Sequence, residues 1–198
     1  MKTYSMRTAF GEALVDAGTR NRDVVVLDCD LSMATKTNLF ANRFPDRFFN
    51  LGIAEQNMMS LAAGMASAGK VPFAVTLAVF ATMRACEQVR TSICIGNLNV
   101  KIAAPYGGLC TAENGPTHQC IADIGVMLPL PNMRILAPSD GASCTAAVRW
   151  AIEHDGPVYL RVLRDGEPVL YEDAGAINVE TGMTLRTGSD VAILCNGY

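Results

Sequence analysis

The sequence lacks the features of membrane, secreted and nucleic-acid-binding proteins. No uninterrupted apolar stretch is long enough to span a bilayer, and the first residues show no apolar signal region. The formal net charge is −3, with acidic and basic residues interspersed, so a basic nucleic-acid-binding surface is missing. We therefore expect a cytoplasmic protein that binds no nucleic acid and no membrane, and whose partners are small molecules or proteins.

Cysteine pairs with metal-ligand spacing are also missing. The seven cysteines are odd in number and widely spaced, no Cys-x-x-Cys pair occurs, and there are only two histidines. This distribution is typical of reduced cysteines that pack inside an intracellular protein. It disfavours a structural zinc site, and we assign no metal ligand to this chain.

The apolar residues that are present indicate the fold class. Half of the 198 residues are hydrophobic, which is enough for a sizeable core without disulfides. Apolar runs of strand length alternate with helical patterns. The expected strands are 23–28, 72–75, 100–104, 133–137 and 157–162, and the expected helices are 8–18, 54–68, 81–95 and 141–153. This alternation predicts an α/β fold with a doubly wound, mostly parallel sheet and helices on both faces.

The C-terminal part departs from this alternation. After Arg164 the sequence is polar and contains glycines as far as residue 188, and a short apolar run follows at 190–195. We interpret residues 1–165 as one domain, 166–188 as a linker and 189–198 as the start of a truncated C-terminal domain. The apolar run is expected to be a buried strand of that second domain.

Two loops interrupt the alternation directly after predicted strands, at Cys29–Lys36 and Tyr106–His118. Open α/β sheets bind ligands at the carboxyl ends of their strands, and irregular loops there tend to carry function. Arg161 and Arg164 end the last strand of the domain and are expected at the same edge. A guanidinium group suits phosphate or carboxylate, although a solvated strand end would have the same sequence.

Three further residues have both an ordinary and a functional interpretation. Glu55 opens a predicted helix, where the helix dipole alone favours an acid, but its small and apolar neighbours favour a buried, proton-sharing carboxyl. Phe80 lies where a strand passes into a helix and is either a core residue or a ligand platform. His118 either caps the next helix or transfers protons, whereas His154 precedes a Gly-Pro stop and is expected only to end its helix.

Four motifs follow one another in a specific order. They are Gly-Ile-Ala-Glu-Gln-Asn-Met at 52–58, Phe80 with Arg84, Glu-Asn-Gly-Pro-Thr-His-Gln at 113–119, and Ala-Pro-Ser-Asp at 137–140. Over about residues 5–165 this order resembles the pyrimidine-binding domain of transketolases. The first residues of the transketolase C-terminal domain look to begin near Ser189. 1-Deoxyxylulose-5-phosphate synthases and the β subunits of 2-oxo acid dehydrogenases share the glutamate motif, but the Gly-Pro-Thr-His-Gln run favours transketolase.

The resemblance implies roles for the residues that match these motifs. Glu55 would hydrogen-bond the aminopyrimidine nitrogen of thiamine diphosphate, and Phe80 would stack on that ring, with Arg84 also at the cofactor. His118 would contact the sugar oxygens and transfer protons during catalysis, as Glu55 does at the cofactor. The implied substrate-binding residues are Arg7, Asp30, Asn114, His118, Arg161 and Arg164.

Arg7 and Arg164 align with positions that bind the phosphate of an acceptor sugar, but three other positions depart from the family pattern. Asn114 stands where transketolases usually carry an aspartate that contacts a donor hydroxyl. Leu77 replaces a common second aromatic residue, and Ala34 lies where a phosphate-binding hydroxyl is often found. These departures leave the donor preference open, and an unusual or less phosphate-dependent acceptor would fit them.

The sequence also lacks the Gly-Asp-Gly motif with a downstream asparagine through which this family binds Mg²⁺ and the diphosphate. Asp155-Gly156 and Asp165-Gly166 have neither the preceding glycine nor the asparagine. The resemblance therefore implies the C-terminal subunit of a split transketolase. An N-terminal transketolase subunit carrying the Gly-Asp-Gly motif would hold Mg²⁺ and the diphosphate, in an α2β2 heterotetramer.

The implied reaction is the transfer of a two-carbon ketol unit between sugars or sugar phosphates. Three alternatives stay open: a subunit similar to 1-deoxyxylulose-5-phosphate synthase, a β-type subunit of a 2-oxo acid dehydrogenase, and a non-catalytic assembly partner. Glu55, Phe80 and His118 occur together in this sequence, which argues against the last alternative.

Overall fold

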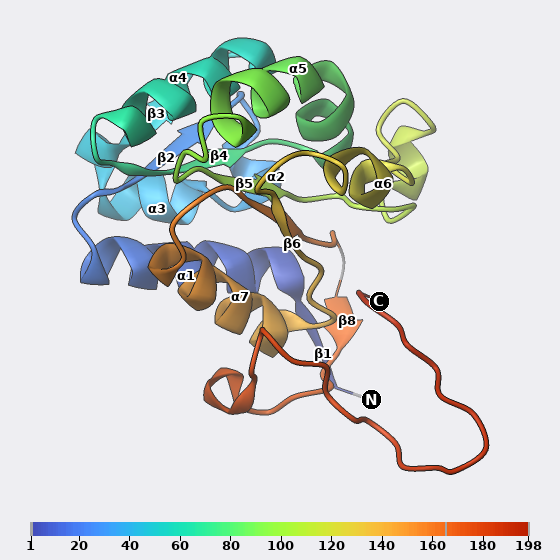
Figure 1. Cartoon of the computed structure of the whole chain (residues 1–198). Coiled ribbons are helices and arrows are strands. Elements are labelled where there is room, and N and C mark those ends of the chain that lie inside the picture. The colour runs from blue at the N-terminus through green and yellow to red at the C-terminus, as the bar shows by residue number, and fades with distance from the viewer. Residues whose placement is uncertain (1, 165, 198) are drawn as a thin grey trace.

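The computed structural model describes residues 2–164 and 166–197, and its centre is a parallel sheet (Figure 1). Six strands lie in the order β3–β2–β4–β5–β7–β6, and every neighbouring pair is parallel. The strands are β2 (Val24–Asp28), β3 (Phe48–Asn50), β4 (Val71–Val75), β5 (Lys101–Ala104), β6 (Arg134–Leu136) and β7 (Val158–Arg161). The predicted fold class is confirmed.

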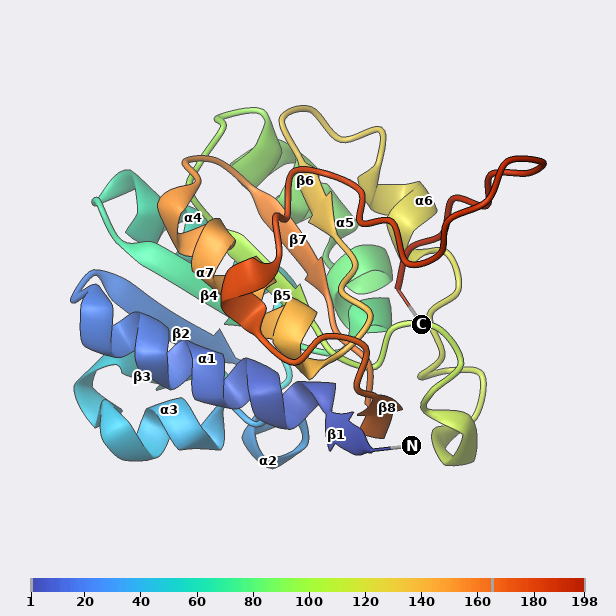
Figure 2. The same cartoon turned by 90° about the horizontal axis from the view of Figure 1, so that it is seen from below.

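Helices cover both faces of this sheet, as Figure 2 shows from below. One face packs against α1 (Met6–Arg20), α3 (Asn38–Arg43) and α7 (Gly141–Glu153), and the other against α4 (Glu55–Ser67), α5 (Cys86–Gln88) and α6 (Asp123–Met127). Strand β2, second from one edge of the sheet, shows why two layers form. Val24 and Val26 enter the core beneath α1, whereas Val25 and Leu27 enter the core beneath α4, because successive side chains point to opposite faces.

The segment 81–95 is not the single regular helix that the sequence predicts. It is divided into a π-helical segment η2 (Phe80–Arg84), the short helix α5, and a second π-helical segment η3 (Val89–Cys94). The N–H of Ala85 donates to the carbonyl of Phe80 at 3.1 Å, five residues back. Each π turn accommodates an extra residue, an arrangement that is frequent at functional sites and that hydrophobic periodicity does not reveal.

The first of the two predicted loops contains a short helix, α2 (Ser32–Thr35), which the sequence did not indicate. Asp28, at the end of β2, organises it. Its buried carboxylate accepts a hydrogen bond from the N–H of Leu31 at 2.6 Å, and the hydroxyls of Thr35 and Thr37 donate to it at 2.9 Å. These contacts satisfy a buried polar group and fix the backbone that follows.

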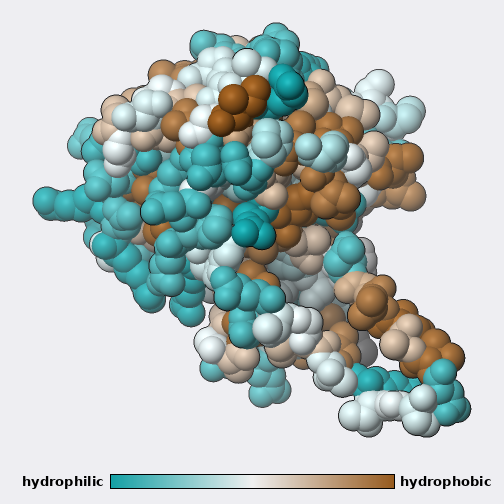
Figure 3. All heavy atoms as spheres, viewed as in Figure 1, coloured by the Kyte–Doolittle hydropathy of each residue, from teal (hydrophilic) through white to brown (hydrophobic). Residues whose placement is uncertain are grey.

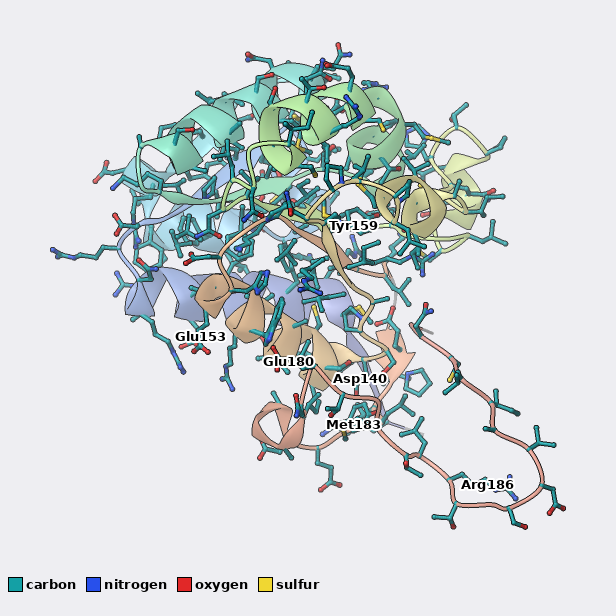
Figure 4. The ribbon with its side chains drawn as sticks, in the orientation of Figure 1. Asp140, Glu153, Tyr159, Glu180, Met183 and Arg186 are labelled. Atoms are coloured by element: carbon teal, nitrogen blue, oxygen red, sulfur yellow. The ribbon has the colours of Figure 1, made fainter. Side chains whose placement is uncertain are left out.

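A second, two-stranded sheet joins the two ends of the domain. β1 (Thr3–Ser5) pairs antiparallel with β8 (Gly166–Pro168). Asp140, labelled in Figure 4, begins α7 and accepts hydrogen bonds from the N–H groups of Leu170 and Tyr171, both at 2.9 Å. The segment predicted as a linker is therefore held against the domain, and farther along it Glu180 accepts a hydrogen bond from the indole N–H of Trp150 on α7 at 3.1 Å.

The predicted buried strand at 190–195 is wrong for this structure. The segment is irregular and exposed, with Ile193 85% and Leu194 97% exposed, and Figure 3 shows its apolar side chains on the surface. A strand needs a neighbour for its backbone hydrogen bonds, and within residues 2–164 and 166–197 no strand pairs with it.

No disulfide joins any two of the described cysteines, and Cys29, Cys94, Cys120 and Cys144 are buried, as expected of packing residues, whereas Cys195 is exposed. No helix in the part of the chain that the structure describes is both long and apolar enough to cross a membrane.

Candidate active site

The predicted site residues lie at the carboxyl edge of the sheet. Because all six strands are parallel, the loops after β2, β4, β5 and β7 emerge at one edge. Helix α4 also begins there, directly after β3, at the turn that contains Gly52 with a φ of 70°. A side chain at that position would be strained, so glycine lets the chain enter α4 sharply.

Glu55 is the first residue of α4, and its carboxylate is buried with 2% exposure. The Nη1 atom of Arg84 lies 2.9 Å from each of its two oxygens. The helix N-terminus and the guanidinium group both favour the charged carboxylate, which compensates for its removal from water. Glu55 is therefore a buried acid with a specific partner, which a helix-start residue in solvent would not have.

Phe80 and Arg84 stand at the two ends of η2, and the guanidinium of Arg84 lies over the Phe80 ring at 4.2 Å from its centroid. His118 contacts the same ring edge-on, with ring centroids 5.4 Å apart. Four residues predicted from three separate motifs thus form one cluster, which we call the Glu55 cluster: Glu55, Phe80, Arg84 and His118.

The two histidines differ in whether they have the helix-end roles that the sequence allows. His118 does not cap the next helix, because α6 has no side-chain cap and the Nδ1 atom of His118 lies 2.9 Å from the Thr117 hydroxyl. His154 does end α7, and it stacks on Trp150 with centroids 4.4 Å apart. His154 thus ends its helix, as expected.

The Glu55 cluster fits an aminopyrimidine ring. The Arg84 guanidinium is a planar group that donates hydrogen bonds to Glu55 while lying over Phe80. An aminopyrimidine is also planar and needs the same two contacts, a carboxylate at its ring nitrogen and an aromatic face. The carboxylate and the aromatic face that such a ring needs therefore lie within reach of one planar group in this chain.

The interior beside the Glu55 cluster is apolar and neutral. The thiol of Cys29 donates to the sulfur of Met58 at 3.6 Å, and both side chains are buried. Burial raises the pKa of Cys29 to about 11, and the negative charge of Glu55 acts in the same direction. Cys29 therefore stays a neutral packing group next to the carboxylate.

A second group of residues lies around Tyr106, directly after β5. Nη1 of Arg7 donates to the Tyr106 hydroxyl at 2.8 Å and to the carbonyl of Ala34 at 2.7 Å, and Nε of Arg7 donates to the carbonyl of Arg164 at 2.6 Å. The guanidinium carbons of Arg7 and Arg164 lie 5.0 and 5.4 Å from the Tyr106 ring centroid. We call Arg7, Tyr106 and Arg164 the arginine pair site.

Sequence reasoning missed Tyr106 as a site residue. Its φ is 67°, a conformation that costs energy for a residue with a side chain and that is concentrated at functional sites. An available signal was the aromatic residue placed between a strand end and the Gly107-Gly108 pair. Two other missed residues act in support: Asp28 orders the loop after β2, and Asp123 holds Arg161.

The remaining predicted substrate residues are not all brought together. Asp30 exchanges hydrogen bonds with the Asn50 side chain. Asn114 is exposed at the end of the short helix η4 (Ala112–Asn114). Arg161 forms an ion pair with the buried Asp123 at 2.7 Å, separate from the contacts of Arg7 and Arg164, so its contact with substrate stays a prediction.

Arg161 also explains the glycines at the start of the loop that carries His118, Gly107 and Gly108. A Cβ atom at Gly107 would lie 2.8 Å from the Cγ of Arg161. Asp123 accepts a second hydrogen bond from the hydroxyl of Tyr159, labelled in Figure 4, at 3.0 Å. The contacts of Asp123 with Arg161 and Tyr159 thus support the start of this loop.

Comparisons with known proteins agree with this architecture. The family described as "Transketolase, pyrimidine binding domain" matches residues 2–166. A "Putative transketolase C-terminal section" from Methanocaldococcus jannaschii is 41% identical over 97% of this chain and 61% of its own length. A 1-deoxy-D-xylulose-5-phosphate synthase from Desulfotalea psychrophila is 35% identical over 96% of this chain but only 30% of its own length.

A solved structure described as "Split gene transketolase, inactive beta4 tetramer" superposes with a TM-score of 0.84 at 48% identity. It covers 94% of this chain, and the chain covers 59% of it. The chain therefore spans about three fifths of the length of the first relative and of this solved protein. The fold and the match over residues 2–166 together show that the chain belongs to the transketolase family as a pyrimidine-binding domain.

Proposed function

We propose that this chain is the C-terminal subunit of a thiamine diphosphate-dependent transketolase and transfers a two-carbon ketol unit between sugars or sugar phosphates. The observation that carries the proposal is the Glu55 cluster. It combines a buried carboxylate, an aromatic face and an imidazole at the carboxyl edge of a parallel sheet. These are the groups that an aminopyrimidine and a reacting sugar require.

When bound, thiamine diphosphate supplies the carbanion chemistry that cleaves and forms the bond beside a ketose carbonyl. In this proposal Glu55 holds a proton at the pyrimidine ring nitrogen, and Phe80 orients the ring. His118 binds a sugar oxygen and moves a proton at that oxygen. Asp30 and Asn114 contact sugar hydroxyls, and the arginine pair site binds the anionic group of the acceptor.

We assign Mg²⁺ and the diphosphate to an N-terminal transketolase subunit, because this sequence has no Gly-Asp-Gly motif. The solved relative supports this assignment, since its description joins a split gene to an inactive β4 tetramer. The proposed assembly is an α2β2 heterotetramer in which each active site lies between unlike subunits.

Calorimetric titration of thiamine diphosphate with Mg²⁺ tests the need for a partner. The chain alone is expected to bind the cofactor weakly and to transfer no ketol unit. A mixture with an N-terminal subunit carrying the Gly-Asp-Gly motif is expected to bind tightly and to turn over. Tight binding and turnover by the chain alone would rule out the split arrangement.

A second candidate is a subunit similar to 1-deoxyxylulose-5-phosphate synthase, which the relatives of that name support. The same complex distinguishes the candidates when it is supplied with either a ketose donor or pyruvate. Pyruvate-dependent release of CO₂ without ketol transfer would favour that synthase or a 2-oxo acid dehydrogenase β-type subunit. A complex that binds no cofactor would indicate an assembly partner.

A further inference from the structure

The arginine pair site is contacted by an acidic side chain that the proposed reaction does not use. Glu113 lies in η4, and its carboxylate forms an ion pair with the Nη2 atom of Arg164. The Arg164 side chain is 24% exposed, whereas that of Glu113 is 68% exposed. The carboxylate therefore reaches the guanidinium from the solvent side, the side from which a substrate would arrive.

The surroundings of this ion pair favour an anion. The described donors of Arg7 are directed to uncharged oxygens, namely the carbonyls of Ala34 and Arg164 and the hydroxyl of Tyr106. The two arginine charges thus share one aromatic ring, and the carboxylate of Glu113 pairs with Arg164. A carboxylate and a phosphate present similar oxygens to the planar donor groups of a guanidinium.

We propose that Glu113 is an internal competitor for the anionic group of the acceptor and thereby sets the preference for phosphorylated over neutral acceptors. This inference rests on the proposed function for the acceptor role of the site. A phosphorylated acceptor must displace the Glu113 carboxylate from Arg164, while a neutral sugar does not have to. Glu113 therefore weakens the binding of phosphorylated acceptors selectively.

The size of the effect follows from the exposure of the pair. An ion pair near the surface is screened by water and contributes little, so its removal is expected to change anion affinity only about two- to fivefold. The carboxylate lies on a short exposed turn, which allows it to leave Arg164 without disturbing the buried core. Glu113 adjusts specificity in this arrangement and is not needed for folding.

Titration of inorganic phosphate into the full chain by calorimetry tests the competition without any turnover. Glu113→Gln is expected to bind phosphate about two- to fivefold more tightly than the unmodified chain. Arg164→Gln is expected to bind it more weakly. Glu172→Gln is the matched control, because it removes the same charge from an exposed position outside the site and is expected to change nothing.

Three results would overturn the proposal. They are equal phosphate affinity with and without Glu113, phosphate binding that does not depend on Arg164, and an equal gain in affinity for the Glu172→Gln control. Each of these results is independent of ketol transfer. If the assembled complex were inactive, the proposed function would fail while the phosphate titrations would still decide whether Glu113 competes with an anion.

In an active complex, the same substitution provides a second test. Glu113→Gln is expected to lower KM for a phosphorylated aldose such as ribose 5-phosphate and to leave KM for ribose unchanged. A parallel change for both acceptors would contradict competition at a phosphate-binding position. The comparison of KM with kcat separates this effect from general damage to the loop, which would lower kcat for both sugars.

Discussion

The buried carboxylate of Glu55 is bound by the Nη1 atom of Arg84, which lies 2.9 Å from each of its oxygens. The two residues belong to different elements, α4 and η2, and the same guanidinium covers the ring of Phe80. The charge of the acid and the position of the aromatic face are thereby linked through one side chain. Changes at Arg84 are expected to affect both.

Arg84→Met tests that link. The substitution keeps the aliphatic length over Phe80 but leaves the Glu55 carboxylate buried without its cationic partner. We expect the free energy of unfolding to fall by about 1–3 kcal/mol, because an unpaired buried polar group keeps its desolvation cost. Urea unfolding of Arg84→Met and of the control Arg90→Met, at an exposed position, measures the difference. Equal losses for both variants would show that the pair contributes no stability.

Tyr106→Phe tests the arginine pair site. The change removes the hydroxyl that accepts a hydrogen bond from Arg7 but keeps the ring against which both guanidinium groups pack. We expect phosphate affinity to fall about three- to tenfold, since the lost hydrogen bond involves a charged donor. Phosphate titration by calorimetry measures it, with Tyr171→Phe as the control. Unchanged affinity would mean that Tyr106 does not position Arg7.

Asp140 is expected to stabilise the chain against acid. It accepts hydrogen bonds from the N–H of Ser143 at 2.8 Å and from those of Leu170 and Tyr171. Burial raises the pKa of Asp140, but the hydrogen bonds outweigh burial and leave the pKa below its usual value. Its contribution is therefore complete above the unfolded pKa of about 4 and is lost as the pH falls through the lower folded pKa.

Asp140→Asn should thus lower the free energy of unfolding at pH 7 by about 1–3 kcal/mol and flatten its decline between about pH 5 and pH 2. Unfolding in urea at a series of pH values gives both quantities. Asp46→Asn, an exposed substitution, serves as the control. An acid decline as steep as that of the unmodified chain would contradict the role of Asp140.

Lys101 is expected to make the free energy of unfolding depend on pH at the alkaline end of the range. Its ammonium donates to the carbonyls of His154 at 2.6 Å and Gly156 at 2.9 Å, and burial lowers its pKa to about 7, against the attraction of Asp155. Because the unfolded pKa is about 10.4, the unfolded chain binds more protons between these values, and stability rises with pH there. Burial of the charged form of Lys101 lowers the free energy of unfolding. This cost is absent above the unfolded pKa and increases as the pH falls towards 7.

Lys101→Met is expected to make the free energy of unfolding less dependent on pH between about pH 7 and pH 10. The measurement is urea unfolding at several pH values in this range, beside Lys70→Met, whose lysine pairs with Asp23 at the surface. Identical slopes for Lys101→Met and the unmodified chain would show that Lys101 does not titrate in this range.

The sequence predicts the inner strands β2, β4, β5 and β7 well because they are almost entirely buried, whereas the partly exposed edge strand β3 was not predicted. β2 is an uninterrupted apolar run before Asp28, and such runs separated by helical patterns leave few alternatives to a parallel sheet. The short elements were missed for the opposite reason. α2 depends on the hydrogen bonds of Asp28 to residues three to nine positions away, and its sequence shows no hydrophobic periodicity that would predict a helix.

The site was partly predictable for a related reason. Glu55, Phe80, Arg84 and His118 belong to motifs that the sequence displays, and their proximity follows from the shared strand edge. The contacts of Arg7 with Tyr106 and of Arg164 with Glu113 join residues 99 and 51 positions apart, which no local pattern contains. The π-helical turns that present Phe80 and Arg84 were likewise invisible to a search for regular helical periodicity.

Glu55 is proposed to act on the cofactor, and turnover of Glu55→Gln in the assembled complex tests this role most directly. Glutamine keeps the shape but cannot hold the proton, so we expect kcat to fall about 100-fold or more while circular dichroism and subunit assembly stay unchanged. Glu87→Gln, an exposed change on α5, should keep full activity. A Glu55→Gln complex with near-normal ketol transfer would contradict the account and return Glu55 to the role of a helix-start residue.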